Sequence, residues 1–219
     1  MAENKQKRRI GILGGTFNPV HTGHLILAEN AYEQFNLDKV IFLPSGNPPH
    51  KENVSYISAK HRAKMVEIAI EDNNHFEMSL EEIEREGITY TSDTLTLMHE
   101  REPLNELFFI LGADSLFTFE YWHEPDIICR HCTILVATRE ELNPKEVEEK
   151  IAYLQNKFDV NVYRIISPDF DISSNLIRHR VFDNKSIKYF TPDKVVEYIN
   201  NNNLYKELIW LWIEMKLMQ

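Results

Sequence analysis

Short apolar runs alternate with longer stretches of helical period along this chain, and that alternation constrains its fold more than any other feature. Runs rich in β-branched and aromatic residues predict strands at 10–13, 40–43, 107–111, 133–137 and 160–165. Apolar residues at helical spacing predict helices at 22–35, 58–71, 93–101, 144–157 and 173–181. We therefore expect an α/β fold: a Rossmann-like, doubly wound parallel sheet with helices on both faces.

Length and composition fit one globular domain. The chain has 219 residues, 43% of them hydrophobic, and we expect a single domain over 1–205 and a C-terminal helical extension over 206–219.

The net charge of −10 argues against a surface that binds nucleic acid. No apolar run reaches the roughly 18 residues of a membrane span, and the basic start does not lead into a secretory signal. We expect a cytoplasmic protein that binds neither nucleic acid nor membrane.

The two cysteines, Cys129 and Cys132, have the spacing of a C-x-x-C pair. A redox pair of this kind begins a helix after a strand, whereas Cys132 leads into the predicted strand 133–137. Two cysteines alone cannot complete a zinc site. We interpret them as small buried residues.

A motif rich in glycine and histidine follows the first predicted strand, GGTFNPVHTGH at 14–24. Its two leading glycines allow the backbone to come close to a ligand, and Thr22 can cap a helix whose N-terminal amides attract an anion. His21 and His24 are three residues apart, hence on one helix face, and Gly23 between them carries no side chain to block access. The motif predicts a phosphate site contacted by both imidazoles.

Other interpretations of this motif fit less well. It lacks the Gly-Lys-Ser/Thr of a Walker loop and the spacing of the dinucleotide fingerprint. Two histidines three apart could also bind a metal, but no nearby carboxylate or third histidine completes such a site, so we expect no metal ligands in the protein itself. A pair of satisfied surface histidines remains the ordinary alternative.

The motif at 14–24 resembles that of the nicotinate-nucleotide adenylyltransferases, a family of H-x-G-H nucleotidyltransferases. A second motif, ISSNLIR at 172–178, resembles the family's I-S-S-T-x-I-R, with Asn175 in place of the threonine. Similar segments lie at 48–51, 87–95, 112–115, Trp122 and 189–198. The resemblance thus extends to about Tyr205, and it implies transfer of AMP from ATP to nicotinate mononucleotide in NAD biosynthesis.

The resemblance also implies roles for individual residues. His21, His24 and Arg178 would be catalytic, and Mg²⁺ would enter with ATP, bound through its phosphates. ATP would contact Gly14, Gly15, Thr16, Phe17, Gly23, Asp114, Ile172, Ser173 and Ser174. Nicotinate mononucleotide would contact Asn47, Lys51, Thr89, Tyr90 and Trp122. The alternatives are helix capping for Asp114 and Ser173–Ser174, core packing for Trp122 and a solvated side chain for Lys51.

Such chemistry needs no activated serine or cysteine, because the acceptor phosphate is already ionised and can attack the α-phosphorus directly. Catalysis then consists of positioning and charge neutralisation. The closest rival is an H-x-G-H transferase with another acceptor, such as nicotinamide mononucleotide, phosphopantetheine or a cytidylyl acceptor. We set aside a fragment of a class I aminoacyl-tRNA synthetase, because the chain is acidic and short and has no K-M-S-K-S string. The presence of both histidines argues against a non-catalytic nucleotide-binding module.

The last residues, 206–219, extend past the expected end of the family. Leu204, Leu208, Leu211, Met215 and Met218 form a helical stripe. Such a stripe more often packs on the protein's own body, and a contact in a homo-oligomer is the alternative hypothesis.

Overall fold

The computed structural model describes residues 7–47, 57–137, 143–168 and 171–206. Its centre is a parallel six-stranded sheet with the order β3-β2-β1-β4-β5-β6. The strands are β1 (Arg9–Gly15), β2 (Lys39–Pro44), β3 (Phe76–Met78), β4 (Glu106–Gly112), β5 (Cys132–Ala137) and β6 (Val162–Ile165). The chain moves outward from β1 to β3 and then returns to place β4 beside β1, so the strand order reverses between β1 and β4.

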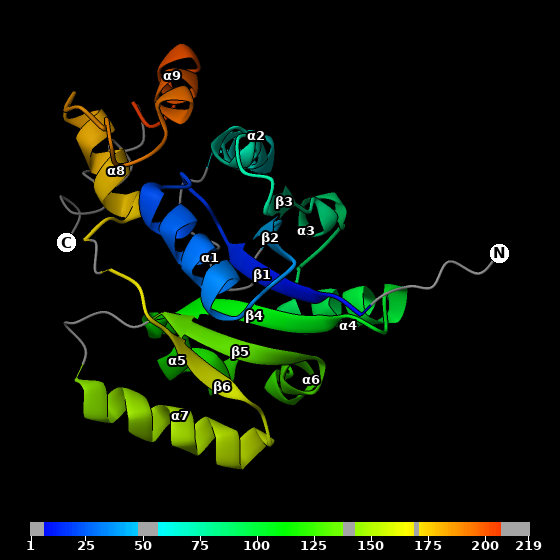
Figure 1. Ribbon diagram of the computed structural model, residues 1–219. Coiled ribbons are helices and arrows are strands. Elements are labelled where there is room, and N and C mark those ends of the chain that lie inside the picture. Colours follow the sequence, from blue (N-terminus) through cyan, green and yellow to red (C-terminus); the bar gives the residue numbers. More distant parts are fainter. Residues whose placement is uncertain (1–6, 48–56, 138–142, 169–170, 207–219) are drawn as a thin grey trace, which may run out of the picture.

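Helices cover both faces of the sheet (Figure 1). On one side lie α1 (Thr22–Gln34), α2 (Ala59–Ile70), α8 (Ser174–Phe182) and α9 (Asp193–Asn201). On the other lie α4 (Thr91–Arg101), α5 (Ala113–Thr118), α6 (Pro125–His131) and α7 (Pro144–Phe158), with a 3-10 turn at Phe119–Tyr121. The short α3 (Glu81–Glu84) follows β3. This arrangement confirms the predicted doubly wound α/β fold.

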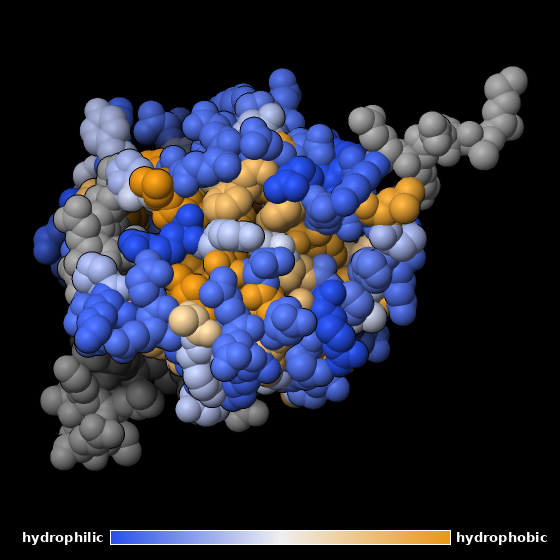
Figure 2. Space-filling view, turned by 60° about the horizontal axis from the view of Figure 1, so that its bottom comes forward, coloured by the Kyte–Doolittle hydropathy of each residue, from blue (hydrophilic) through white to orange (hydrophobic). Residues whose placement is uncertain are grey.

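Alternate residues of each strand point into two separate cores. In β4, Phe108 and Ile110 pack with the α1, α2, α8 and α9 side, whereas Phe109 and Leu111 pack with the α4 to α7 side. Burial on both faces explains why these strands read as continuous apolar runs. The helices, in contrast, are apolar on one stripe only, and Figure 2 shows hydrophilic residues around an apolar area at the centre of one face.

The five predicted strands and five predicted helices are all present, with ends shifted by a few residues. No prediction was made for β3, α3, α5, α6 and α9. Four of these five have three to seven residues, too few for a clear period of burial. Among the described residues, no helix is long and apolar enough to cross a membrane.

Both cysteines are buried, which confirms their interpretation as core residues. Cys129 lies in α6 and Cys132 begins β5, and both thiols are free. Burial raises the pKa of Cys129 to about 12, and burial likewise raises the pKa of Cys132 far above its usual range. Both side chains therefore stay protonated and unreactive at neutral pH.

Candidate active site

A cavity of about 270 Å³ opens where the strand order reverses, at the carboxyl ends of the central strands. Its lining comes from the ends of β1 and β4, from Ala137 at the end of β5 and from Ser167 after β6. Ligands of doubly wound folds bind at this position, because the connecting loops diverge there and leave a crevice. Of the predicted site residues, the cavity wall includes Gly14, His21, Gly23, His24, Asp114, Trp122, Ile172, Ser173 and Ser174.

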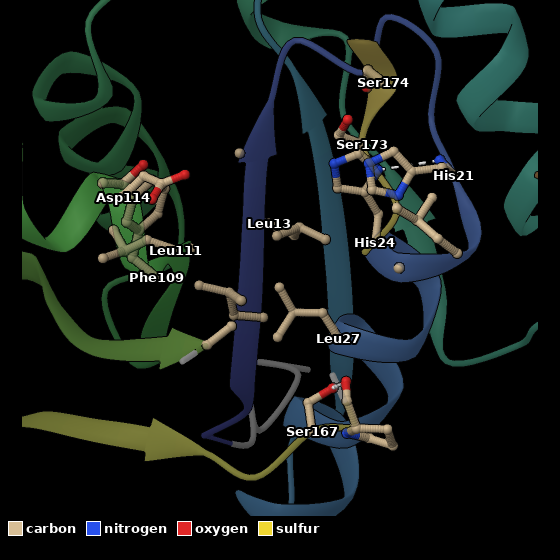
Figure 3. A pocket seen from close by; sticks show the side chains of 18 of the residues that line it. Leu13, His21, His24, Leu27, Phe109, Leu111, Asp114, Ser167, Ser173 and Ser174 are labelled. Atoms are coloured by element: carbon tan, nitrogen blue, oxygen red, sulfur yellow. Dashed lines mark hydrogen bonds between the residues drawn. The ribbon is translucent and has the colours of Figure 1, made fainter. Parts of the chain in front are cut away.

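His21 and His24 lie together on one wall of the cavity, as predicted (Figure 3). Their rings are stacked, with centroids 3.6 Å apart and planes inclined by 26°. Helix α1 begins at Thr22, so the N-cap is His21 and not Thr22. The hydroxyl of Thr22 instead donates to the backbone carbonyl of Tyr189 at 3.1 Å.

The surroundings of His24 favour its neutral form. Desolvation of the imidazole, and secondarily the neighbouring His21 ring, hold the pKa of His24 well below its usual range. The backbone N–H of His21 donates to Nδ1 of His24 at 3.2 Å, so the proton of the neutral ring resides on Nε2. His24 can therefore offer an N–H to a phosphate oxygen without carrying a charge.

The second motif forms the start of α8 beside the histidines (Figure 3). Ser173 is the N-cap and its hydroxyl accepts from the backbone N–H of Leu176 at 3.1 Å, as the sequence indicated. Ser174 does not cap the helix; its hydroxyl donates to the carbonyl of Pro19 at 2.7 Å. A helix N-terminus at a cavity wall provides backbone N–H groups and a favourable dipole for an anion.

Arg178 does not line the cavity, but it contacts the first motif from one helical turn further along α8. Its guanidinium donates to the carbonyl of Asn18 at 2.7 Å and to Oδ1 of Asn175 at 3.1 Å. The residue that departs from the family motif, Asn175, thus helps to orient the arginine. The two motifs, about 150 residues apart in sequence, are in direct contact.

Three predicted ATP contacts, Gly15, Thr16 and Phe17, lie behind the cavity wall. Phe17 is 2% exposed, and its ring packs edge-on against the ring of His24, with centroids 5.0 Å apart. A Cβ on Gly15 would lie 3.1 Å from the Phe17 ring, which explains the absence of a side chain there. Asp114 faces the histidines across the cavity from the first turn of α5 (Figure 3).

Of the described residues predicted for the acceptor, Trp122 lines the cavity, whereas Asn47, Thr89 and Tyr90 are not part of its lining. Trp122 lines the cavity and also packs against Phe109, with ring centroids 6.1 Å apart. The N–H of Thr89 donates to the carbonyl of Asn47 at 3.1 Å, which brings two of the predicted residues together. Tyr90 lies outside the cavity lining and stacks on His123, at 3.9 Å between centroids. Lys51 is outside the described residues.

Sequence reasoning missed Arg62, which is 3% exposed and holds two loops of the site together. Its guanidinium donates to the carbonyls of Thr16 and Ser45, each at 2.7 Å. Nothing in the sequence distinguishes this arginine from the solvated charges of other helices. Among the described residues, no group of three or more His, Cys, Asp or Glu side chains is arranged to hold a metal ion.

Known proteins match this chain over most of its length. A family described as cytidylyltransferase-like matches residues 12–180. A probable nicotinate-nucleotide adenylyltransferase of Lachnoclostridium phytofermentans is 42% identical over 198 residues, which cover 90% of this chain and 99% of that protein. The chain belongs to the nicotinate-nucleotide adenylyltransferase family. A further family member, from Desulfitobacterium hafniense, is 42% identical over 93% of this chain and 98% of its own.

Solved structures agree with the fold of this adenylyltransferase family. The nicotinic acid mononucleotide adenylyltransferase of Plasmodium falciparum, in complex with NaAD, superposes with a TM-score of 0.73 at 20% identity. That match covers 90% of this chain and 97% of the parasite protein. A second structure of the parasite protein, in complex with APC, gives a TM-score of 0.71. These structures confirm the fold, and the relatives at 42% identity confirm the family resemblance inferred from the two motifs.

Proposed function

We propose that this adenylyltransferase joins the AMP part of ATP to nicotinate mononucleotide, giving nicotinate adenine dinucleotide and pyrophosphate. An oxygen of the 5′-phosphate of nicotinate mononucleotide forms a bond to the α-phosphorus of ATP. The bond between the α-phosphorus and the oxygen that bridges the α- and β-phosphates breaks, and pyrophosphate leaves with that oxygen. The observation that carries the proposal is the cavity in which two histidines and the start of α8 face one crevice. Relatives with 42% identity carry this activity in their names.

The histidines are the groups best suited to stabilise the reacting phosphate. Nε2–H of His24 would donate to a non-bridging oxygen, and the stacked His21 would contact the adjoining phosphate. Hydrogen-bond donors that are held rigidly where charge develops stabilise the transition state more than mobile donors do, since they need not reorganise during the reaction. The bond from His21 to Nδ1 and the Phe17 ring against His24 supply this rigidity.

The leaving pyrophosphate would be bound by α8. Ser173 and Ser174 line the cavity, so the start of α8 would offer backbone N–H groups there, and Arg178 would add positive charge one turn further in. The carboxylate of Asp114 on the opposite wall would accept hydrogen bonds from ribose hydroxyls. Gly14, Gly15, Thr16, Phe17, Gly23 and Ile172 would contribute mainly backbone contacts to ATP.

We further propose that Mg²⁺ enters with ATP and is held by its phosphates. The described residues offer no cluster of carboxylates or histidines that would hold the ion independently. When bound, the ion neutralises phosphate charge and favours departure of pyrophosphate.

The nicotinate ring and its carboxylate would be recognised by Thr89, Tyr90 and Trp122, with Asn47 and Lys51 nearby. Aromatic side chains suit an electron-poor pyridinium ring. A site built from N–H donors accepts a carboxylate, whereas the NH₂ of an amide would meet those donors with a donor of its own. The contact between Thr89 and Asn47 supports this grouping.

The deciding experiment measures pyrophosphate release from ATP and Mg²⁺, with nicotinate mononucleotide or nicotinamide mononucleotide at equal concentration. We expect strong preference for the acid. Preference for the amide would show that the protein transfers AMP, but to nicotinamide mononucleotide. If neither substrate leads to release of pyrophosphate, the proposed reaction is overturned and a nucleotide-binding module is favoured.

We also propose a cytoplasmic location and a homo-oligomer that uses residues 206–219. The free thiols fit a reducing compartment. Leu204 of the apolar stripe is buried in the described core, so the other four stripe residues, which lie outside the described residues, would supply the contact. Sedimentation of the chain truncated after Lys206 tests this contact: an unchanged oligomer mass would rule it out.

A further inference from the structure

The loop from β1 to α1, residues 16–21, follows Gly14 and Gly15 at the end of β1 and ends in His21, and it is held through its backbone carbonyls. Arg62 donates to the carbonyl of Thr16 at 2.7 Å, Ser174 to that of Pro19 at 2.7 Å and Thr191 to that of Val20 at 2.9 Å. Two of these three donors come from the C-terminal part of the chain, after β6. The shape of this loop therefore depends on residues far away in sequence.

Asn18 in the middle of the loop is held from two sides. Its carbonyl accepts from Arg178 at 2.7 Å, and its side-chain Oδ1 accepts from the hydroxyl of Tyr205 at 2.9 Å. Asn18 is 2% exposed and Tyr205 is 3% exposed, so water does not compete for this bond. Burial raises the pKa of Tyr205 far above its usual range, which keeps the hydroxyl protonated as a donor.

The position of Asn18 connects Tyr205 to the reacting groups. Asn18 follows Phe17, whose ring packs against His24, and it precedes His21 by three residues. It also touches Arg178, the proposed partner of the leaving group. A small displacement of Asn18 would therefore shift both histidines relative to Arg178 and the start of α8. Shifts of about 1 Å can cost about 100-fold in rate when catalysis depends on alignment.

We propose that Tyr205 is a positioning residue for adenylyl transfer, which acts by fixing Asn18 and with it the phosphate-binding loop. Tyr205 does not line the cavity and lies outside the family motifs at 14–24 and 172–178. Its hydroxyl is the group that matters, because the ring alone would fill the same volume without holding the amide. The inference rests on the proposed function, since it assumes that this loop binds ATP.

The test is the substitution Tyr205→Phe, which removes one hydroxyl and keeps the ring. We expect kcat/KM for ATP to fall about tenfold or more, since alignment is lost, while KM for the acceptor changes by less than about twofold. Binding of a non-hydrolysable ATP analogue, measured by calorimetry, should weaken as well. That second measurement needs no acceptor, so it tests the loop even if the proposed reaction fails.

A matched control is available in Tyr198→Phe. The Tyr198 hydroxyl lies 2.9 Å from Nδ1 of His61, between α9 and α2. This variant also loses one tyrosine hydroxyl with one partner, and we expect wild-type kinetics and ATP-analogue binding. Equal losses in both variants would point to general destabilisation and overturn the proposal.

A double-mutant cycle with Asn18→Leu sharpens the test. Asn18→Leu removes the amide oxygen that accepts the hydrogen bond from Tyr205. In that background, adding Tyr205→Phe should change kcat/KM by less than about twofold, because the two residues act through one bond. Fully additive losses would contradict action through Asn18. Wild-type kinetics of the Tyr205→Phe variant would overturn the positioning role. A circular dichroism spectrum that shows the variant to be unfolded would overturn it as well.

Discussion

The backbone N–H of His21 donates to Nδ1 of His24 at 3.2 Å, and the two imidazole rings stack with centroids 3.6 Å apart. The hydrogen bond determines which nitrogen of His24 bears the proton. The stacking, in turn, disfavours a positive charge on both rings at once. The pair therefore presents neutral or singly charged donors to the cavity, held by the start of α1.

Replacement of His24 by alanine should abolish most of the turnover and leave the fold intact. Loss of one fixed donor to developing charge costs about 100- to 1,000-fold in kcat. The measurement is steady-state pyrophosphate release, with circular dichroism to confirm folding. His99→Ala serves as the control, because His99 lies in the last turn of α4 and outside the cavity lining. Near-normal turnover of His24→Ala would remove His24 from the mechanism.

The low pKa of His24 predicts how stability changes with pH. In the unfolded chain this histidine binds a proton near its ordinary pKa of about 6.5, whereas in the folded protein it stays neutral to lower pH. The unfolded state then holds more protons below pH 6.5, so the free energy of unfolding falls as the pH falls through this window. Urea unfolding between pH 7.5 and 5.5 should show a smaller loss for His24→Gln than for the wild type. An identical loss in both proteins would contradict the assigned shift.

Gly23→Ala should lower turnover without lowering stability. A Cβ at this position would lie 3.2 Å from Nδ1 and 3.3 Å from Cε1 of His21, so the ring has to move. Alanine is favoured over glycine in a helix by up to about 1 kcal/mol, so α1 itself should tolerate the change. Thermal unfolding and kcat, measured on the same preparation, separate the two effects. Unchanged kcat would show that His21 can shift without consequence.

The cysteines should prove dispensable for catalysis. Their thiols have raised pKa values and lie in the core, away from the cavity lining. Alkylation of the native protein by iodoacetamide at pH 8 should be much slower than alkylation of the urea-unfolded chain, since little thiolate is present. The double variant Cys129→Ala, Cys132→Ala should retain turnover, with a modest loss of stability from lost core volume. Rapid native labelling would contradict the buried placement.

The sheet could be predicted because its central strands are long and buried on both faces. Strand 107–111 contributes to both cores, and no polar residue interrupts it. The edge strand β3 has three residues, one of them the exposed Glu77, so it has no apolar run that sequence reasoning could detect. Helix α9 was not predicted for a different reason. Most of it lies in the segment 189–198, which was assigned only by its similarity to the family and not by its apolar spacing.

The site was predictable where chemistry-bearing residues stand close together in sequence. His21, Gly23 and His24 form one compact motif, and His21 and His24 meet because they occupy the N-cap and N3 positions at the start of α1. Contacts between distant segments were beyond reach. The burial of Arg62 and the bond from Tyr205 to Asn18 depend on how loops pack after the fold has formed. A single arginine or tyrosine in a helical or terminal segment carries no local sign of such a role.

The clamps on the loop from β1 to α1 have a consequence for synthesis of the protein. The loop is made first, yet Ser174, Arg178, Thr191 and Tyr205 reach the ribosomal exit long after it. At translation rates of about 5–20 residues per second, this delay lasts on the order of ten seconds. During that interval the growing chain contains the phosphate-binding motif but not the side chains that hold its loop in place. An unfinished chain should therefore bind nucleotide poorly, and we expect tight binding only after the last helices have docked.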